Sequence, residues 1–478
     1  MAEIQIPLSG LTNKAAKISN QASSSPSEEY QSDANLKRIG LTTMGCKVNA
    51  YESELISEAF KSDQWITVPA TDIADLYIIN TCTVTQEADK QARREVRKVV
   101  RINPEALVIV TGCYAQMDSQ ACAEIPGVDL VVGNDRKLDI HGLLPALQKG
   151  ELPKVLVGDL DEHVSLPNEL LTGYEAQTRA FIQIQQGCDQ GCTFCIIHRA
   201  RGPSRSLAPT LIKRQVEKLA LNGYPEIVIC GVDLGSYGED FSETNTRYGL
   251  VELLKELLDL EVSNNSHFRV RLSSIDPAHI SDQLIDLIQT ESRICNHIHL
   301  SLQSGNSLIL KRMKRRYCRE DVYERINKLR SKVPDLVISA DVMVGFPTED
   351  QNQFMETKQA LIDLEIAFPH IFTYSNRSGT PAERIPKTKQ VSHSEKKRRA
   401  KVLRETAEIL QKSLHTSQIG KEVWVLPEKQ LDKGLKARSE HYLTVRVLTD
   451  NNAFLGKWLR VKYQGLIDGQ LYAEIVSA

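Results

Sequence analysis

The densest group of reactive side chains is the segment QQGCDQGCTFCIIHRARGPSRS, residues 185–206. Cys188, Cys192 and Cys195 form a C-x3-C-x2-C pattern in this segment, which we call the cysteine loop. Structural zinc sites use four ligands, commonly as two separate pairs, and the chain offers no second pair of this kind. Closely spaced thiolates favour an iron–sulfur cluster, because one loop can reach several of its corners. Three thiolates leave one iron open to a substrate.

Three further cysteines each follow a short apolar run that is typical of a β-strand. Cys46 ends TTMGC, Cys82 ends IINTC and Cys113 ends VIVTGC, and we call them the strand-end cysteines. Groups just beyond the carboxyl ends of neighbouring parallel strands converge on one crevice. We therefore expect these thiols to bind a second cluster, again with one open iron. The alternative is three buried core thiols, since unpaired cysteine is often buried.

The chain carries ten cysteines, and its amino terminus lacks the charged-then-apolar pattern of a secretory signal. No stretch approaches the ~20 consecutive apolar residues of a membrane helix. We therefore expect a cytoplasmic protein whose cysteines are reduced thiols. The four outside the two groups are interpreted as structural: Cys122, Cys230, Cys295 and Cys318.

The length of 478 residues predicts about three domains, and the pattern indicates an α/β protein. Residues 1–36 are rich in Ser, Gln, Asn and Glu, which predicts a disordered tail. From 37 to 140, three apolar runs alternate with polar helical stretches, which predicts a small α/β domain with a mainly parallel sheet. Residues 141–178 show little periodicity and are expected to form a linker.

The cysteine loop opens the central section, residues 179–415, where a strand-then-helix unit repeats six times. Six units predict a partial (β/α)6 barrel, short of the eight that close one. A basic helix at about 393–415 then leads to residues 417–478, whose alternating short strands predict a small β-barrel.

Positive charge is concentrated locally, although the formal net charge is only −2. Residues 384–404 hold nine Lys or Arg and one acid, Glu395, a local charge of +8. Such runs are typical of phosphate binding, and the alternative is a solvated helix face. Two further runs of basic residues are Lys90, Arg93, Arg94, Arg97, Lys98 and Arg101, and Lys311, Arg312, Lys314, Arg315, Arg316 and Arg319.

The cysteine loop on a six-unit β/α core resembles the radical S-adenosylmethionine enzymes. The segments TMGCKVNAYESE, NTCTVTQEADKQARR and VTGCYAQ resemble the methylthiotransferase branch of that superfamily. The terminal barrel is similar to the TRAM RNA-binding module of that branch. The resemblance covers about residue 37 to the end.

The resemblance implies two [4Fe–4S] clusters and two S-adenosylmethionine molecules per turnover. The cysteine loop would hold the cluster whose open iron chelates S-adenosylmethionine, which is cleaved to a 5′-deoxyadenosyl radical. The strand-end cysteines would hold an auxiliary cluster, whose open iron carries the sulfur that is methylated and transferred. No residue beyond these ligands is assigned a catalytic role.

Polar residues after later strands are expected to contact S-adenosylmethionine, since a β/α barrel gathers its site there. These residues are Asp233, Ser273, Ser274, Gln303 and Glu349. The expected partners are the tRNA anticodon loop and an electron donor protein, with neither a membrane nor DNA. The residues predicted to contact RNA are Arg199, Arg201, Arg205, Arg315, Arg316, Lys396, Lys397 and Arg398.

The methylthiotransferase branch divides by substrate, and the resemblance is to the type that acts on N6-threonylcarbamoyladenosine in tRNA. Lys47 follows the first strand-end cysteine, where the isopentenyladenosine type usually has Gln and the ribosomal-protein aspartate type usually has Pro. One departure lies at His198 and Arg199, where the threonylcarbamoyl type is expected to have Pro, often followed by a polar or aromatic residue.

Both other substrate types remain alternatives at this point. Outside this branch, the alternatives are an iron–sulfur RNA-binding or scaffold protein without turnover, and a zinc-binding regulator. Cleavage of S-adenosylmethionine separates an enzyme from a scaffold, and iron and sulfide content separates a cluster protein from a zinc protein.

Overall fold

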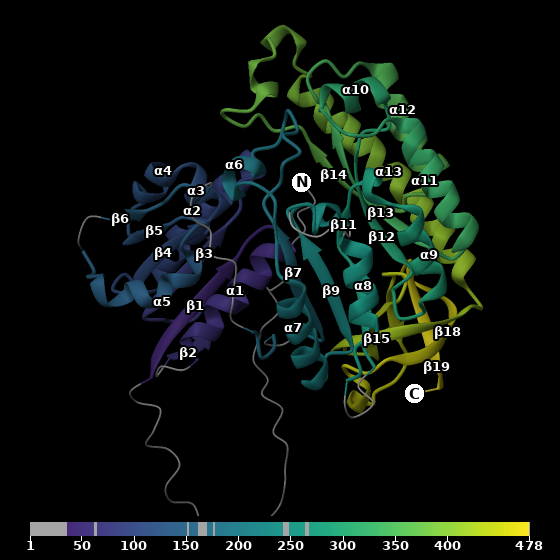
Figure 1. Cartoon of the computed structure of the whole chain (residues 1–478), viewed down its shortest axis with the longest axis horizontal. Coiled ribbons are helices and arrows are strands. Elements are labelled where there is room, and N and C mark those ends of the chain that lie inside the picture. Colours follow the sequence, from purple (N-terminus) through teal and green to yellow (C-terminus); the bar gives the residue numbers. More distant parts are fainter. Residues whose placement is uncertain are drawn as a thin grey trace, which may run out of the picture. The chain divides into compact units, whose positions relative to one another are not determined.

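The computed structural model describes residues 36–61, 65–150, 153–160, 170–174, 177–241, 248–262 and 267–477. The predicted tail, apart from Leu36, lies outside the described residues. The described chain divides into two compact units, one up to residue 160 and the other from residue 170 onward. The predicted α/β fold class is confirmed in both units (Figure 1).

The first unit contains a six-stranded parallel sheet with the order β2-β1-β3-β4-β5-β6. Its strands are β1 (Lys37–Thr43), β2 (Trp65–Val68), β3 (Leu76–Thr81), β4 (Leu107–Gly112), β5 (Leu130–Val132) and β6 (Lys154–Leu156). Strand β3 is buried along its whole length, as expected for a central strand covered on both faces. Strand β6 falls inside the segment 141–178 that the sequence indicated as a linker, because three residues are too short for a periodic signal.

Helices cover both faces of this sheet. Its helices are α1 (Lys47–Phe60), α2 (Gln86–Ile102), α3 (Cys113–Met117), α4 (Ser119–Ala123) and α5 (Ile140–Leu143). One apolar cluster joins Ile56 and Phe60 of α1 to one face of the sheet, and another joins Val96 of α2 to the opposite face. Helix α2 is amphipathic, and Thr85 caps its amino end by accepting a hydrogen bond from Ala88 N.

The second unit begins with a partial barrel of parallel strands and helices, as predicted. Its parallel strands are β7 (Arg179–Gln186), β9 (Glu226–Gly231), β10 (Arg269–Leu272), β11 (Ser274–Ile275), β12 (His297–Gln303), β13 (Val337–Val344) and β14 (Phe368–Thr373). They form the groups β10-β9-β7-β8 and β11-β12-β13-β14, where β8 (Arg205–Ser206) is antiparallel to β7. An isolated parallel bridge joins Val270 of β10 to Ile294, which precedes β12.

Helices follow the strands of this partial barrel and lie outside them (Figure 1). They are α6 (Ile197–Arg201), α7 (Pro209–Leu221), α8 (Leu250–Leu258), α9 (Asp282–Thr290), α10 (Ser307–Arg312), α11 (Arg319–Lys332), α12 (Gln351–Asp363) and α13 (His393–Gln418). Helix α13 is the predicted basic helix, capped by Ser392, and it continues to Gln418.

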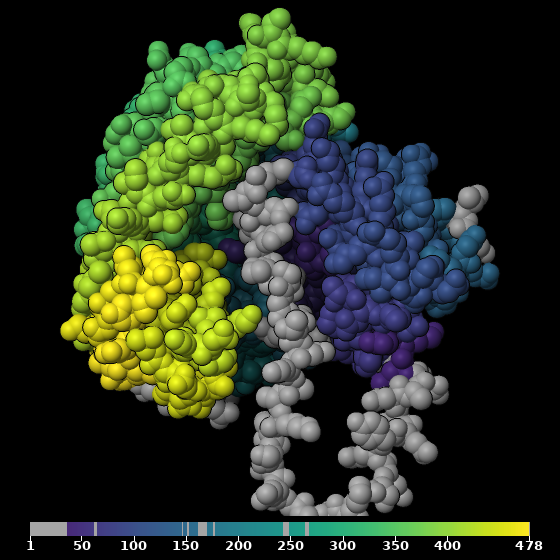
Figure 2. All heavy atoms as spheres, turned by 180° about the vertical axis from the view of Figure 1, so that it is seen from behind, coloured from purple at the N-terminus to yellow at the C-terminus, as the bar shows by residue number. Residues whose placement is uncertain are grey.

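The carboxyl-terminal strands close into a five-stranded barrel with the order β15-β16-β17-β19-β18. They are β15 (Glu422–Gln430), β16 (Leu435–Ser439), β17 (Thr444–Val447), β18 (Leu459–Ile467) and β19 (Gln470–Ser477). The sequence analysis missed β16, because the sequence LKARS alternates apolar and charged residues over only five positions. In Figure 2 the yellow-green α13 leads along one exposed face to the yellow barrel.

The small barrel packs against the amino ends of the core strands. Arg271 of β10 forms a bidentate ion pair with Glu226 of β9, at 2.7 and 2.9 Å. The same guanidinium donates to the carbonyl oxygens of Ser439 and Glu440, at 3.2 and 3.0 Å. Trp458 Nε1 donates to Pro225 O at 2.9 Å. The small barrel is therefore bonded to the base of the partial barrel.

Candidate functional site

The cysteine loop connects β7 to α6 at the carboxyl end of the strands. Gly187 begins the turn with a φ of +74°, and a Cβ placed there would lie 1.8 Å from Pro203 O. Only glycine fits such a position without a backbone shift. Further along, Cys188 N donates to Gly202 O at 3.1 Å, and Cys195 N donates to Cys192 O at 3.0 Å. The backbone thus fixes a tight loop that carries all three thiols.

Asp233 follows β9 and lies directly against this loop. Its Oδ2 accepts hydrogen bonds from Gln190 Nε2 at 3.1 Å and Ser236 Oγ at 2.8 Å, and lies 3.9 Å from Cys188 Sγ. Burial, and then the Asp233 carboxylate, raise the pKa of the Cys188 thiol above its usual range. A bound cation offsets this penalty, because metal ligation requires the thiolate. The chemistry of the site therefore suits a positively charged iron centre.

Three of the residues predicted to contact S-adenosylmethionine carry a buried oxygen with no hydrogen-bond partner among the described residues. They are Ser273 Oγ, Gln303 Oε1 and Glu349 Oε1. Gln303 also has a φ of +62°, which is uncommon for a residue other than glycine, and it ends β12 at a shift in strand register. Buried acceptors normally have donors, so these oxygens suit a ligand rich in N–H and O–H groups. S-adenosylmethionine is such a ligand.

Two of the predicted contacts, Ser274 and Glu349, also form hydrogen bonds with protein groups. Ser274 Oγ shares a hydrogen bond with Ser301 Oγ at 2.8 Å. Glu349 Oε2 accepts hydrogen bonds from Gly345 N at 2.7 Å and from Arg399 Nη1 at 2.6 Å. Glu349 therefore also anchors helix α13 to the core, and burial raises the pKa of its carboxyl group.

The strand-end cysteines lie at one edge of the sheet in the first unit. Strands β1, β3 and β4 are adjacent, and their register pairs Thr43 with Asn80 and Thr81 with Gly112. Cys82 directly follows Thr81, Cys113 directly follows Gly112, and Cys46 lies three residues after Thr43. The three cysteines therefore lie beyond the same edge of the sheet. The donor set of three thiols at the carboxyl ends of parallel strands suits a second cluster.

The surroundings of these thiols differ. Cys46 is exposed at the amino end of α1, Cys82 is half-buried and Cys113 is buried. Gly45 has a φ of +90°, and a Cβ there would lie 2.9 Å from Cys82 Sγ. Asn134 Nδ2 lies 3.8 Å from Cys113 Sγ. All ten cysteines fall in the described part of the chain, and all are free of disulfides.

The residues predicted to contact RNA divide into exposed and buried side chains. The exposed ones are Arg199, Arg316, Lys397 and Arg398. Arg205 is half-buried and donates to Arg201 O at 3.0 Å, and Lys396 donates to Tyr374 O at 3.1 Å. Arg201 is only 1% exposed, and the Arg315 side chain only 8%. The structure thus places these last two away from the surface that an RNA backbone would meet.

A polar chain along β12, β13 and β14 was missed by the sequence analysis. His299 Nδ1 lies 2.7 Å from Ser339 Oγ, and His299 Nε2 lies 3.2 Å from Asp341 Oδ1. His370 Nδ1 lies 3.4 Å from the same oxygen. Burial alone would raise the pKa of Asp341, but the two imidazoles outweigh it and hold that pKa below its usual range. The alternation in HIHL was the available signal that His297 and His299 share one face of β12.

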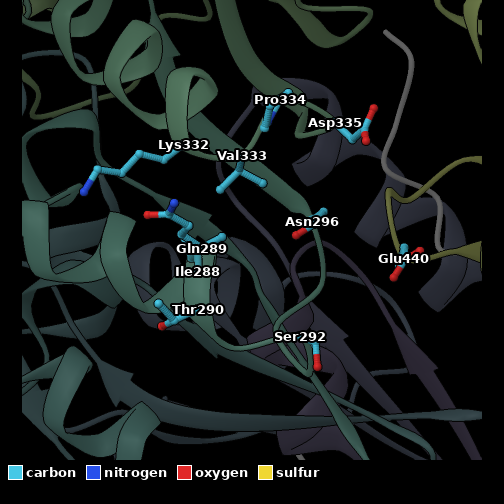
Figure 3. Close-up of a pocket in the computed structure, with 10 residues that line it drawn as sticks. All are labelled: Ile288, Gln289, Thr290, Ser292, Asn296, Lys332, Val333, Pro334, Asp335 and Glu440. Atoms are coloured by element: carbon cyan, nitrogen blue, oxygen red, sulfur yellow. The ribbon is translucent and has the colours of Figure 1, made fainter.

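A cavity of about 280 Å³ lies at the other end of the strands (Figure 3). Asn296 and Asp335 line it, just before β12 and β13 begin, together with Lys332 and Glu440. The cysteine loop follows the carboxyl end of β7. This cavity is therefore separate from the candidate site.

Among the described helices, none is both long enough and apolar enough to cross a bilayer.

Two family models match the chain. Residues 38–133 match the uncharacterized protein family UPF0004, and residues 182–361 match the radical SAM superfamily. The first match contains the strand-end cysteines, and the second contains the cysteine loop and the core strands up to β13. The two matches thus cover both candidate cluster sites.

Curated relatives match along nearly the whole chain. The threonylcarbamoyladenosine tRNA methylthiotransferase MtaB of Rickettsia prowazekii is 37% identical over 92% of this chain and 98% of that protein. MtaB of Bacillus subtilis is 36% identical over 89% of this chain and 93% of that protein. The tRNA-2-methylthio-N(6)-dimethylallyladenosine synthase of Christiangramia forsetii is 31% identical over 93% of this chain and 95% of that protein.

Among solved structures, the radical S-adenosylmethionine methyltransferase TsrM of Kitasatospora setae matches with a TM-score of 0.51. The match covers 73% of this chain and 77% of TsrM, at 14% sequence identity. That structure contains cobalamin and a [4Fe–4S] cluster. At this identity the likeness extends to the fold alone, which agrees with the partial barrel described above.

Proposed function

The chain belongs to the radical S-adenosylmethionine methylthiotransferase family, and we propose that it converts N6-threonylcarbamoyladenosine beside the tRNA anticodon to the 2-methylthio derivative. The observation that carries this substrate is the 37% identity to the threonylcarbamoyladenosine enzyme along 98% of that enzyme. The dimethylallyladenosine enzyme reaches 31% at similar coverage, so it supplies the second candidate substrate.

The residues that would hold the cofactors lie in the two sites described above. Cys188, Cys192 and Cys195 would ligate one [4Fe–4S] cluster, and the strand-end cysteines would ligate the auxiliary cluster. When bound, the first cluster and S-adenosylmethionine would supply one-electron reduction and a carbon radical, and the auxiliary cluster would carry the sulfur that is transferred.

The side chains of this site would position the ligand. The tight turn at Gly187 presents the three thiols together, and Asp233 is fixed beside Cys188 by Gln190 and Ser236. The unpartnered oxygens of Ser273 and Gln303 would accept hydrogen bonds from S-adenosylmethionine. A methylthiotransferase needs such rigid placement, because a misplaced radical reacts with the protein itself.

The tRNA contact would involve the exposed cations Arg199, Arg316, Lys397 and Arg398. Their charge would give salt-dependent, sequence-independent binding of phosphates. We further propose a cytoplasmic location, the anticodon loop as the part of tRNA that is bound, and an electron donor protein as the second partner. Exposed positive charge supports the RNA contact, and ten cysteines outside disulfides support the location.

Mass spectrometry of tRNA nucleosides tests the proposal directly. Cells lacking the gene should lose 2-methylthio-N6-threonylcarbamoyladenosine and regain it when the intact gene is returned. A gene encoding Cys192→Ala should not restore it, because the loop then lacks one cluster ligand. If only the isopentenyl derivative responds, the substrate is the second candidate, and if neither responds, the tRNA proposal fails.

A further inference from the structure

The segment that joins α10 to α11, residues 313–318, lies against the cysteine loop. Thr193, between two of the thiols, donates its backbone N–H to Met313 O at 3.1 Å and its hydroxyl to Arg312 O at 2.8 Å. Arg315 Nη1 then lies 3.4 Å from Cys192 Sγ, within hydrogen-bond range for sulfur. A segment far along the sequence therefore contacts the cysteine loop at adjacent residues.

The Arg315 guanidinium is fixed by four protein groups. It forms an ion pair with Asp276, and Nη2 also donates to Ser301 O at 3.2 Å. Its Nε donates to Tyr317 Oη at 3.0 Å, and the Tyr317 ring centroid lies 5.0 Å from Arg315 Cζ. Tyr317 Oη in turn donates to Ser301 O at 2.5 Å. Ser301 of β12, Asp276 after β11 and Tyr317 thus hold the guanidinium in one orientation.

Burial makes this contact electrostatically important. The Arg315 side chain is 8% exposed, Asp276 is 4% exposed, and Cys192 is 5% exposed. Charges interact more strongly where water is excluded, and a guanidinium remains protonated in proteins. A hydrogen bond from a cation to a cluster sulfur stabilises the more negative, reduced cluster, and so raises its reduction potential.

We propose that Arg315 is a positioning residue that tunes the reduction potential of the cluster at Cys188, Cys192 and Cys195. The sequence predicted an RNA contact for Arg315, whereas its burial and its bond to Cys192 assign it to the cluster. This inference rests on the proposed function, because it requires a [4Fe–4S] cluster at the cysteine loop. Asp276 and Tyr317 serve the same purpose indirectly, since they orient the guanidinium.

The test is a redox titration of the full-length holoenzyme, followed by electron paramagnetic resonance. Arg315→Met removes the donor and the charge while it keeps side-chain length, and Arg316→Met is the matched control, because Arg316 is exposed. We expect Arg315→Met to make reduction about tenfold less favourable, equivalent to ~59 mV for one electron. Arg316→Met should have the same cluster reduction potential as the unaltered protein.

Arg315→Met leaves the buried Asp276 without its cation, which can destabilise the loop. The double variant Arg315→Met with Asp276→Asn removes that unpaired charge and keeps an acceptor for Ala278 N, which Asp276 caps at 3.0 Å. The double variant should have full iron and sulfide content and a potential below that of the unaltered protein, because the hydrogen bond to Cys192 is still absent, although loss of the Asp276 charge offsets part of the decrease. The titration is repeated in a protein whose strand-end cysteines are replaced by alanine. Any electron paramagnetic resonance signal that remains then belongs to the cysteine-loop cluster.

The outcomes separate this inference from the proposed function. An unaltered potential in a fully loaded Arg315→Met protein, or a difference that appears only after S-adenosylmethionine is added, would overturn the inference and leave the cluster in place. The second of these results would indicate contact with the ligand instead. Absence of any cluster signal from the unaltered protein would mean that the proposed function itself has failed.

Discussion

At the scale of single residues, the pair of Arg271 and Glu226 combines structural and electrostatic roles. Their side chains are 1% and 0% exposed, so neither charge has access to water. Burial alone would raise the pKa of Glu226, but Arg271 and Arg179 outweigh it and hold that pKa at about 2. A pair of this kind is maintained only while both charges are present.

We predict that Glu226→Gln lowers the free energy of unfolding by about 3–5 kcal/mol at neutral pH, because it leaves Arg271 buried without a counterion. The pKa of Glu226 is depressed from 4.5 to about 2 on folding, so its contribution is present above pH 4.5 and is lost as the pH falls toward 2. Urea unfolding of the unaltered protein and of Glu226→Gln should show that their difference in free energy of unfolding decreases as the pH falls from 4.5 toward 2. A constant difference would contradict the assigned pKa.

At the scale of elements, the turn from β7 into the cysteine loop depends on its backbone. We predict that Gly187→Ala reduces iron and sulfide loading by at least half, although all three thiols remain. The φ of +74° and the contact with Pro203 O both oppose a Cβ. Gly191→Ala is the matched control, because Gly191 has a φ of +56° but, among the described residues, a Cβ there would meet only the flexible Lys314 Nζ, at 3.5 Å.

Quantification of iron and acid-labile sulfide after anaerobic purification measures the effect. Gly191→Ala should load substantially more cluster than Gly187→Ala, since it carries backbone strain without a steric collision. Equal loading of the two variants would show that crowding at Pro203 does not govern the loop. Circular dichroism would verify that both variants keep the fold.

Most of the elements could be predicted from the sequence, because their signals are local. The three apolar runs predicted between residues 37 and 140 are β1, β3 and β4, and the basic helix predicted at about 393–415 is α13. Strands β6 and β16 were missed, since three to five residues carry too little periodicity. The cysteines of both candidate sites were predicted from their spacing and from their place after strands.

The contacts that depend on tertiary structure could not be predicted in this way. Arg315 was grouped with surface cations because its neighbours in sequence are basic, and only the fold brings it to Cys192. Likewise, nothing local indicates that Glu349 meets Arg399, 50 residues later. Charge patterns in a sequence predict exposure on average, and they fail where a partner from a distant element compensates the charge.

At the scale of the whole molecule, the carboxyl-terminal barrel is bonded to the core through Arg271 and stabilises it. We predict that a chain ending at Gly420 has a thermal unfolding midpoint at least several degrees below that of the core in the full-length protein. Removal of the barrel deletes the acceptors Ser439 O and Glu440 O and exposes the Arg271 region to water. An independent appended module would leave that midpoint unchanged, and differential scanning calorimetry distinguishes the two cases.

The bond between Arg271 and Glu440 also has a consequence for synthesis of the chain. These residues are 169 positions apart, so the ribosome makes the core strands long before the barrel that covers their base. At typical translation rates this interval is on the order of 10 to 30 s. During that time Arg271 and Glu226 lack their final cover. A message truncated before β15 would leave this buried ion pair permanently without that cover.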